Sequence, residues 1–66
     1  MITNKQYQNW VDGKCYLEYV GNLYEYAGAV LNDIILSDVN NGDCVFMRPE
    51  RILKNTNYVD FKDVSK

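Results

Sequence analysis

Residues 15–48 read CYLEYVGNLYEYAGAVLNDIILSDVNNGDCVFMR, a stretch rich in tyrosine, valine, isoleucine and leucine. Residues that favour turns interrupt its apolar runs at short intervals, and this pattern is typical of short β-strands. The expected strands cover residues 15–20, 23–30, 34–39 and 44–48. The Asn41-Gly42 pair between the last two runs is the strongest short-range hairpin signal in the chain.

Residues that favour turns or end strands predict the connections between these strands. Turns are expected at Gly21-Asn22 and Asn32-Asp33, and Gly28 predicts a bulge or bend late in the second strand. Pro49 has no N–H to donate, so it ends the fourth strand and begins a single 3₁₀ turn over residues 49–52. A fifth strand is expected at 58–61, and residues 62–66 are expected to fray.

The N-terminal segment, about residues 3–12, predicts a short helix. Thr3 and Gln6 match a capping box, and Gly13 suits the residue that follows a helix. The apolar face of this helix comprises Tyr7, Trp10 and Val11. Two turns of isolated helix are unstable in water, so this helix must dock on the rest of the chain.

One short helix and five short strands, spanning about residues 14–61, predict a single domain over residues 1–66. A flat sheet of this size leaves two edges unpaired, whereas closure into a barrel pairs them. The expected fold is therefore mostly β, a small five-stranded barrel with a short N-terminal helix. Its expected core comprises Leu17, Leu23, Val30, Ile34, Leu36, Val45, Met47, Ile52 and Val59.

Residues 21–53 resemble the small barrels of the Sm-like and SH3-like classes. Sm-like proteins have a helix before the barrel and a glycine that bends the second strand, and Gly28 is similar to that glycine. The runs 34–39 and 45–48 resemble the strands that follow in that family, although Pro49 stands where the family has glycine. The acidic-plus-asparagine pair that binds RNA in Sm-like proteins is not clearly present. The resemblance implies a small barrel and, on the Sm-like side, RNA binding.

Composition excludes several classes of function. Nine acidic and seven basic residues give a net charge of −2, which does not favour a broad phosphate-binding surface. No apolar run approaches the ~20 residues of a membrane span, so no membrane association is expected. Histidine is absent, which removes the commonest general base and metal ligand. No cofactor or metal site is expected.

The two cysteines, Cys15 and Cys44, are expected to be buried and reduced, because both lie in apolar runs. A disulfide between them stays open as an alternative, since sequence does not set their separation. Two thiols without histidine are too few for a zinc site. This cysteine usage predicts a cytoplasmic protein.

No set of residues supports catalysis. Ser37 and Ser65 are the only serines, and neither has a neighbouring base. Three aspartates, at positions 33, 38 and 43, flank turns, where carboxylates ordinarily cap backbone N–H groups. The four glycines are too scattered for a phosphate-binding loop. We therefore expect a protein that is not an enzyme.

Tyrosine is the most informative residue type, with six in the chain. The expected partner-binding residues are four tyrosines and both arginines: Tyr16, Tyr19, Tyr24, Tyr26, Arg48 and Arg51. Tyrosine and arginine concentrate binding energy at interfaces. The alternatives are that the tyrosines pack in the core and that the arginines pair with Glu50 or Asp38.

Two functions follow from these residues. The first is a small non-enzymatic protein-binding module, such as a phage or mobile-element accessory protein that inhibits or modulates a host or defence protein by stoichiometric binding. The eight asparagines and the short chain suit such a protein. The second is an Sm-like oligonucleotide- or RNA-binding barrel, in which bases stack on tyrosines and a homo-oligomeric ring concentrates the arginines.

Overall fold

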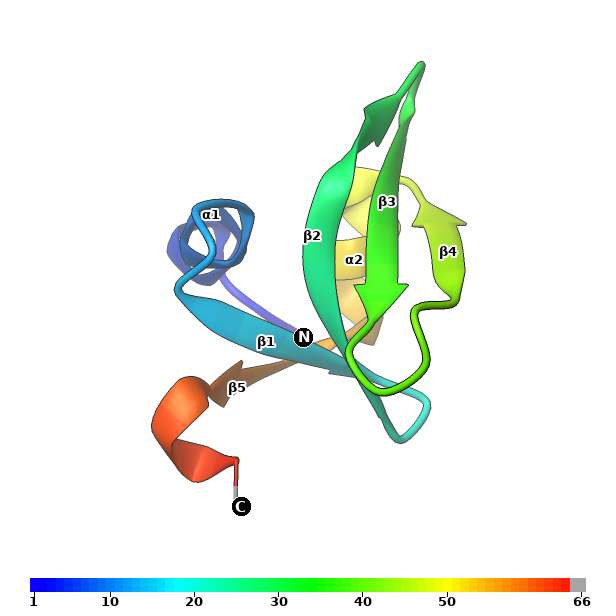
Figure 1. Ribbon diagram of the computed structural model, residues 1–66. Coiled ribbons are helices and arrows are strands. Elements are labelled where there is room, and N and C mark those ends of the chain that lie inside the picture. The colour runs from blue at the N-terminus through cyan, green and yellow to red at the C-terminus, as the bar shows by residue number, and fades with distance from the viewer. Residues whose placement is uncertain (65–66) are drawn as a thin grey trace.

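The computed structural model describes residues 1–64, and it is mostly β with a short N-terminal helix, as the sequence predicts (Figure 1). The elements in chain order are α1 (Asn4–Val11), β1 (Cys15–Tyr19), β2 (Asn22–Val30), β3 (Asp33–Asp38), β4 (Cys44–Met47), α2 (Pro49–Asn55), β5 (Asn57–Asp60) and the 3₁₀ helix η1 (Phe61–Asp63). Residues 62–66 were expected to fray. Residues 62 and 63 instead belong to η1, and positions 65 and 66 lie outside the described residues.

The strands form one antiparallel sheet in the order β4-β3-β2-β1-β5. The sheet does not close, so the predicted barrel is not observed: β4 and β5 lie at its two ends. Each of these edge strands has four residues, and a helix, not a tight turn, joins them. The sheet therefore keeps two edges instead of pairing them.

The connection after β4 is α-helical, which corrects the predicted 3₁₀ turn over residues 49–52. Pro49 occupies the first helical position, where its missing N–H costs nothing. The Ile52 N–H donates to the Arg48 carbonyl at 3.1 Å, an α-helical i to i−4 bond. Ile52 is fully buried, so packing of its side chain against the sheet stabilises a helix too short to form alone.

Two hairpin turns lie one residue earlier than the sequence predicts. Tyr19 pairs with Asn22, so Val20 and Gly21 form the β1–β2 turn, with φ values of 50° and 81°. Positive φ at both central residues is the type I′ geometry that matches strand twist. The β2–β3 turn is centred on Leu31, whose φ is 56°. Neither valine nor leucine favours this conformation, which is why the sequence pointed to the asparagines instead.

The predicted bulge in β2 and the hairpin between β3 and β4 are both confirmed. The β2–β3 register shifts between Tyr26 and Ala29, and Gly28 between them has a φ of 119°. Within the β3–β4 loop, Gly42 has a φ of 80°, and its N–H donates to the Asp38 carbonyl at 2.8 Å. The bulge bends β2, and the β2–β3 hairpin extends beyond the rest of the sheet (Figure 1).

The core lies between the sheet and the two helices, which contribute Trp10 and Ile52 to it. Its buried members are Ile2, Trp10, Cys15, Leu17, Tyr24, Leu36, Met47 and Ile52. Four of the predicted core residues are among them, and Leu23, Ile34, Val45 and Val59 are half-buried. The assignment of Val30 was wrong: it is 47% exposed, because the end of the β2–β3 hairpin projects past the core.

The helix α1 has the predicted capping box. The Thr3 hydroxyl accepts from the Gln6 N–H at 3.1 Å, and the Gln6 side chain accepts from the Thr3 N–H at 3.0 Å. Trp10 is fully buried, with Tyr7 and Val11 packed at the edge of the core. The docking predicted for this helix is thereby confirmed.

The two cysteines differ in environment. Cys15 is buried as predicted, whereas Cys44 is exposed, which corrects the expectation for the second thiol. Cys44 begins β4 and alternates with the inward Val45, so its side chain lies on the outer face. Both thiols are free, so the alternative of a disulfide is not observed.

Candidate binding site

The six predicted binding residues do not form one surface. Tyr24 is 6% exposed and belongs to the core, and Tyr26 is half-buried with its ring edge-on to Trp10 at 5.5 Å between centroids. Tyr16 lies on the opposite face of β1, where its ring contacts Phe61 at 4.7 Å. In each of these three tyrosines, contacts within the chain cover most of the ring.

The other three residues lie together. Tyr19 at the end of β1, Arg48 between β4 and α2, and Arg51 in α2 line one open cavity of about 260 Å³. The remaining residues that line this cavity are Asp33, Val45, Phe46 and Met47. Segments far apart in sequence therefore bring one predicted tyrosine and both predicted arginines to one place.

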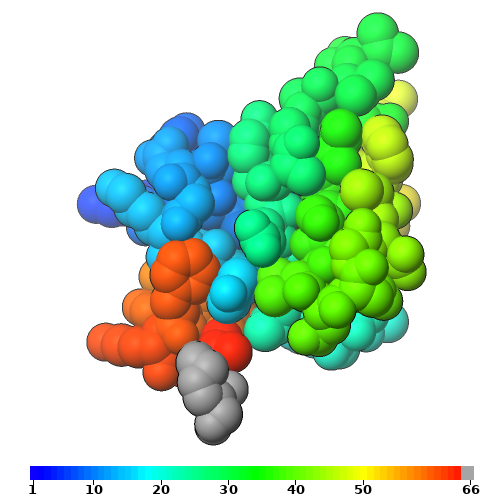
Figure 2. Space-filling model, viewed as in Figure 1, coloured from blue at the N-terminus to red at the C-terminus, as the bar shows by residue number. Residues whose placement is uncertain are grey.

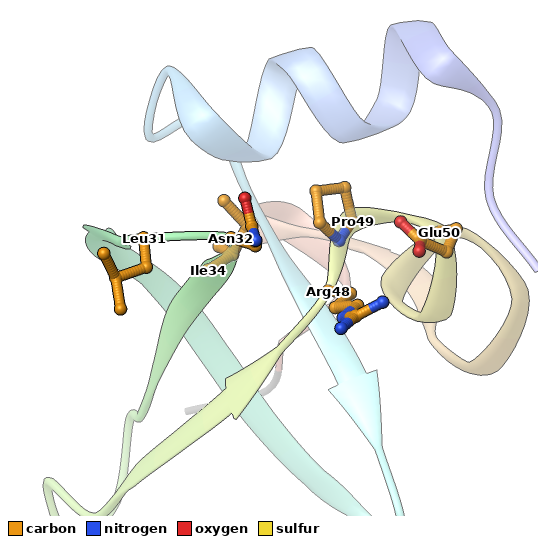
Figure 3. Close-up of a pocket in the computed structure, with 6 residues that line it drawn as sticks. All are labelled: Leu31, Asn32, Ile34, Arg48, Pro49 and Glu50. Atoms are coloured by element: carbon orange, nitrogen blue, oxygen red, sulfur yellow. The ribbon is translucent and has the colours of Figure 1, made fainter.

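A second open cavity, of about 420 Å³, adjoins the first at Arg48 (Figure 3). It is lined by Leu31, Asn32, Ile34, Arg48, Pro49 and Glu50. We call the two cavities together the β4 groove, because both follow β4 and its continuation into α2. The yellow-green surface of this region lies beside the projecting β2–β3 hairpin in Figure 2.

Strand alternation in β4 determines which side chains face the groove. Val45 and Met47 point toward the core side, where Met47 is buried and Val45 half-buried. Phe46 between them points to the outer side and is 56% exposed. Sequence reasoning missed Phe46, although the alternation Cys44-Val45-Phe46-Met47 with two inward neighbours was the signal that could have found it.

The two arginines are exposed and have no ionic partner. Neither guanidinium forms a hydrogen bond or ion pair with any residue in 1–64. The predicted alternative, pairing with Glu50 or Asp38, is therefore not observed: Asp38 is buried and accepts a hydrogen bond from the Asn40 N–H at 2.8 Å. The cavity that contains Tyr19 thus carries two cations against one carboxylate, that of Asp33, in a chain of net charge −2.

Within residues 1–64, no three histidine, cysteine, aspartate or glutamate residues gather as a metal site would require. No helix in this part of the chain is both long enough and apolar enough to cross a membrane.

Comparison with known proteins adds no relative. No protein-family model matches the chain, and neither a curated protein nor a solved structure is significantly similar to it.

Proposed function

We propose that this chain is a small protein-binding module without catalytic activity, and that it docks on another protein through the β4 groove. The observation that carries the proposal is the meeting of Tyr19, Arg48 and Arg51 at one open cavity, where neither guanidinium has a partner among residues 1–64. Tyrosine and arginine are the residues most enriched at the centres of protein interfaces. Its action on the partner is inhibition or modulation by stoichiometric binding.

Exposed apolar side chains at the β4 groove also support the proposal. Phe46 is 56% exposed beside the first cavity, and Leu31 is 98% exposed beside the second. Burying such side chains against a partner is favourable by about 25 cal/mol per Å² of apolar area. An origin in a phage or mobile element stays a prediction from the sequence.

Oligonucleotide binding, the alternative function, has less support. It requires several exposed rings on which bases stack, and Tyr24 and Tyr26 are largely covered by core contacts. It also requires clustered positive charge, whereas Asp33 and Glu50 lie among the arginines.

Affinity capture from source cells tests the proposal. The parent protein is compared with an Arg48→Ala/Arg51→Ala variant and with a matched Lys5→Ala/Lys62→Ala variant, which removes the same charge elsewhere. We expect one protein to be retained in a stoichiometric amount after nuclease treatment, and each arginine to contribute about 1–3 kcal/mol to binding. The lysine variant should bind like the parent.

Two results would contradict the proposal. If nuclease treatment abolishes all retention, the partner is a nucleic acid. If the double arginine variant retains its partner as well as the parent does, the β4 groove is not the binding surface. Circular dichroism and the melting temperature of each variant establish beforehand that it is folded.

A further inference from the structure

We propose that the partner binds as an extended segment that adds a β-strand to the free edge of β4, with an acidic side chain directed at Arg48 and Arg51. This inference rests on the proposed function and specifies the conformation and charge of the segment that is bound. Three observations on residues 1–64 carry it: a strand edge that no other strand pairs with, the direction of its backbone groups, and two arginines without a partner in this range.

The first observation is the open edge. The strand β4 is the terminal strand of the sheet, and in the described part of the chain β3 is its one pairing partner. An edge strand presents a row of backbone donors and acceptors, and extended peptides bind by continuing the hydrogen-bonded ladder. Here no proline within β4 (Cys44–Met47) and no lysine protects the edge.

The second observation concerns which backbone groups are free. The Asp38 N–H donates to the carbonyl of Asp43 at 2.7 Å, so these two opposed residues form a hydrogen-bonded pair. Hydrogen-bonded and non-hydrogen-bonded pairs alternate along an antiparallel ladder. The next opposed pair, Ser37 and Cys44, is therefore of the non-hydrogen-bonded kind.

Continuing this alternation along the register gives the direction of each group in β4. The N–H and C=O groups of Val45 and Met47 point toward β3, where these residues lie opposite Leu36 and Ile34. The N–H and C=O groups of Phe46, like those of Cys44, therefore point away from the sheet. These are the groups to which an added strand would bond.

The third observation is charge. Side chains of an added strand alternate between the two faces of the sheet, so every second residue would lie on the side of Val45 and Met47. The cavity along this edge is lined by Val45, Phe46 and Met47 together with Arg48 and Arg51, whose guanidiniums have no hydrogen-bond or ionic partner within residues 1–64. A carboxylate there can accept paired N–H bonds from a guanidinium, an arrangement stronger than a neutral hydrogen bond. Residues on the other face would pack beside the exposed ring of Phe46.

Selection from a library of random linear peptides tests the inference directly, because a segment that binds in extended form does not need a folded context. The full-length chain is immobilised and the enriched peptides are sequenced. We expect acidic residues to be enriched, alternating with apolar ones. On binding such a peptide, the backbone amides of Cys44 and Phe46 should become protected from hydrogen exchange, and those of β5 should not.

Matched variants separate the backbone contribution from that of the side chains. Phe46→Ala and Phe46→Pro both remove the ring, but only the proline removes the outward N–H, and proline is tolerated where an N–H faces solvent. We expect Phe46→Pro to weaken a selected peptide about tenfold more than Phe46→Ala does. Arg48→Glu/Arg51→Glu should weaken it by about tenfold or more, and Lys5→Glu by less than about twofold.

The outcomes distinguish this inference from the proposed function. If no peptide is enriched, or if bound peptides leave the Cys44 and Phe46 amides unprotected, strand addition is wrong, even where affinity capture has shown a protein partner at the groove. Protection of the same amides in the free protein, with a doubled molecular mass, would show that a second copy occupies the edge and would also overturn the inference. The exchange measurement uses the parent chain, so it decides the matter even if Phe46→Pro fails to fold.

Discussion

The indole N–H of Trp10 donates a buried hydrogen bond to the backbone carbonyl of Tyr24 at 2.9 Å. This bond joins α1 to the first half of β2, and Trp10 itself is fully buried. The helix has only eight residues and would not be stable alone, so this contact together with the packing of the indole ring holds it in place.

Replacing Trp10 with phenylalanine should therefore lower the free energy of unfolding by about 2–3 kcal/mol, because it removes a buried donor and leaves a void. Chemical denaturation monitored by circular dichroism measures the change. Lys5→Ala, on the exposed side of the same helix, is the control and should change stability by less than about 0.5 kcal/mol. Equal effects of the two substitutions would mean that Trp10 does not anchor α1.

Leu36 and Leu31 provide a matched pair for testing the core. Leu36 is fully buried in β3, whereas Leu31 is 98% exposed. Leu36→Ala should cost about 2–5 kcal/mol, a large share of the stability of so small a domain, and Leu31→Ala should cost almost nothing. Thermal unfolding measures both. A shift of less than a degree or two for Leu36→Ala would show that the strand register is incorrect.

The β1–β2 turn contains a residue in an unfavourable conformation. Val20 has a φ of 50°, which is rare for a β-branched residue, and its side chain is 78% exposed. Val20→Asn creates the Asn-Gly pair that type I′ turns favour, so it should stabilise the protein by about 1 kcal/mol. A higher melting temperature is expected, and a lower one would contradict the turn geometry.

The two thiols should react at different rates. Burial raises the pKa of the Cys15 thiol, and the nearby Asp60 carboxylate raises it further. Because the thiolate is the reactive form, alkylation of Cys15 in the folded protein should be slow and should become fast on unfolding. Cys44 is exposed and should be labelled quickly. Mass spectrometry of a time course identifies each site, and fast labelling of Cys15 in the native protein would contradict its burial.

Stability should fall in acid partly through Glu18. Hydrogen bonds from the Asn57 side chain at 2.8 Å and from the Gly21 N–H at 2.9 Å lower the pKa of this carboxyl below its usual value of 4.5. A carboxyl whose pKa is lower in the folded than in the unfolded state stabilises the fold above the unfolded pKa. That contribution is lost as the pH falls through 4.5 and below.

Glu18→Gln should therefore lose less melting temperature between pH 7 and pH 3 than the parent does. Glu25→Gln is the matched control, because Glu25 is exposed on β2, and it should leave the pH dependence unchanged. Identical pH profiles for the parent and Glu18→Gln would show that these hydrogen bonds do not persist in solution.

Much of the local structure could be predicted from the sequence, because it depends on neighbouring residues. The capping box at Thr3 and the bulge at Gly28 were both predicted correctly. So was the hairpin between β3 and β4. Each of these features arises from the chemistry of a few consecutive residues. The proximity of the two arginines is also a local feature, since Arg48 and Arg51 flank Pro49 and Glu50 in the sequence.

The tertiary structure decided which of these residues are exposed and which are buried. Tyr19 and Tyr24 have similar sequence contexts, yet Tyr24 is in the core while Tyr19 lines the groove with the arginines. The folding of residues 49–55 as a helix leaves β4 as a free edge, which no local pattern indicates. The physical reason is that turn and capping preferences act over a few residues, whereas burial and edge pairing depend on segments brought together only by the completed sheet.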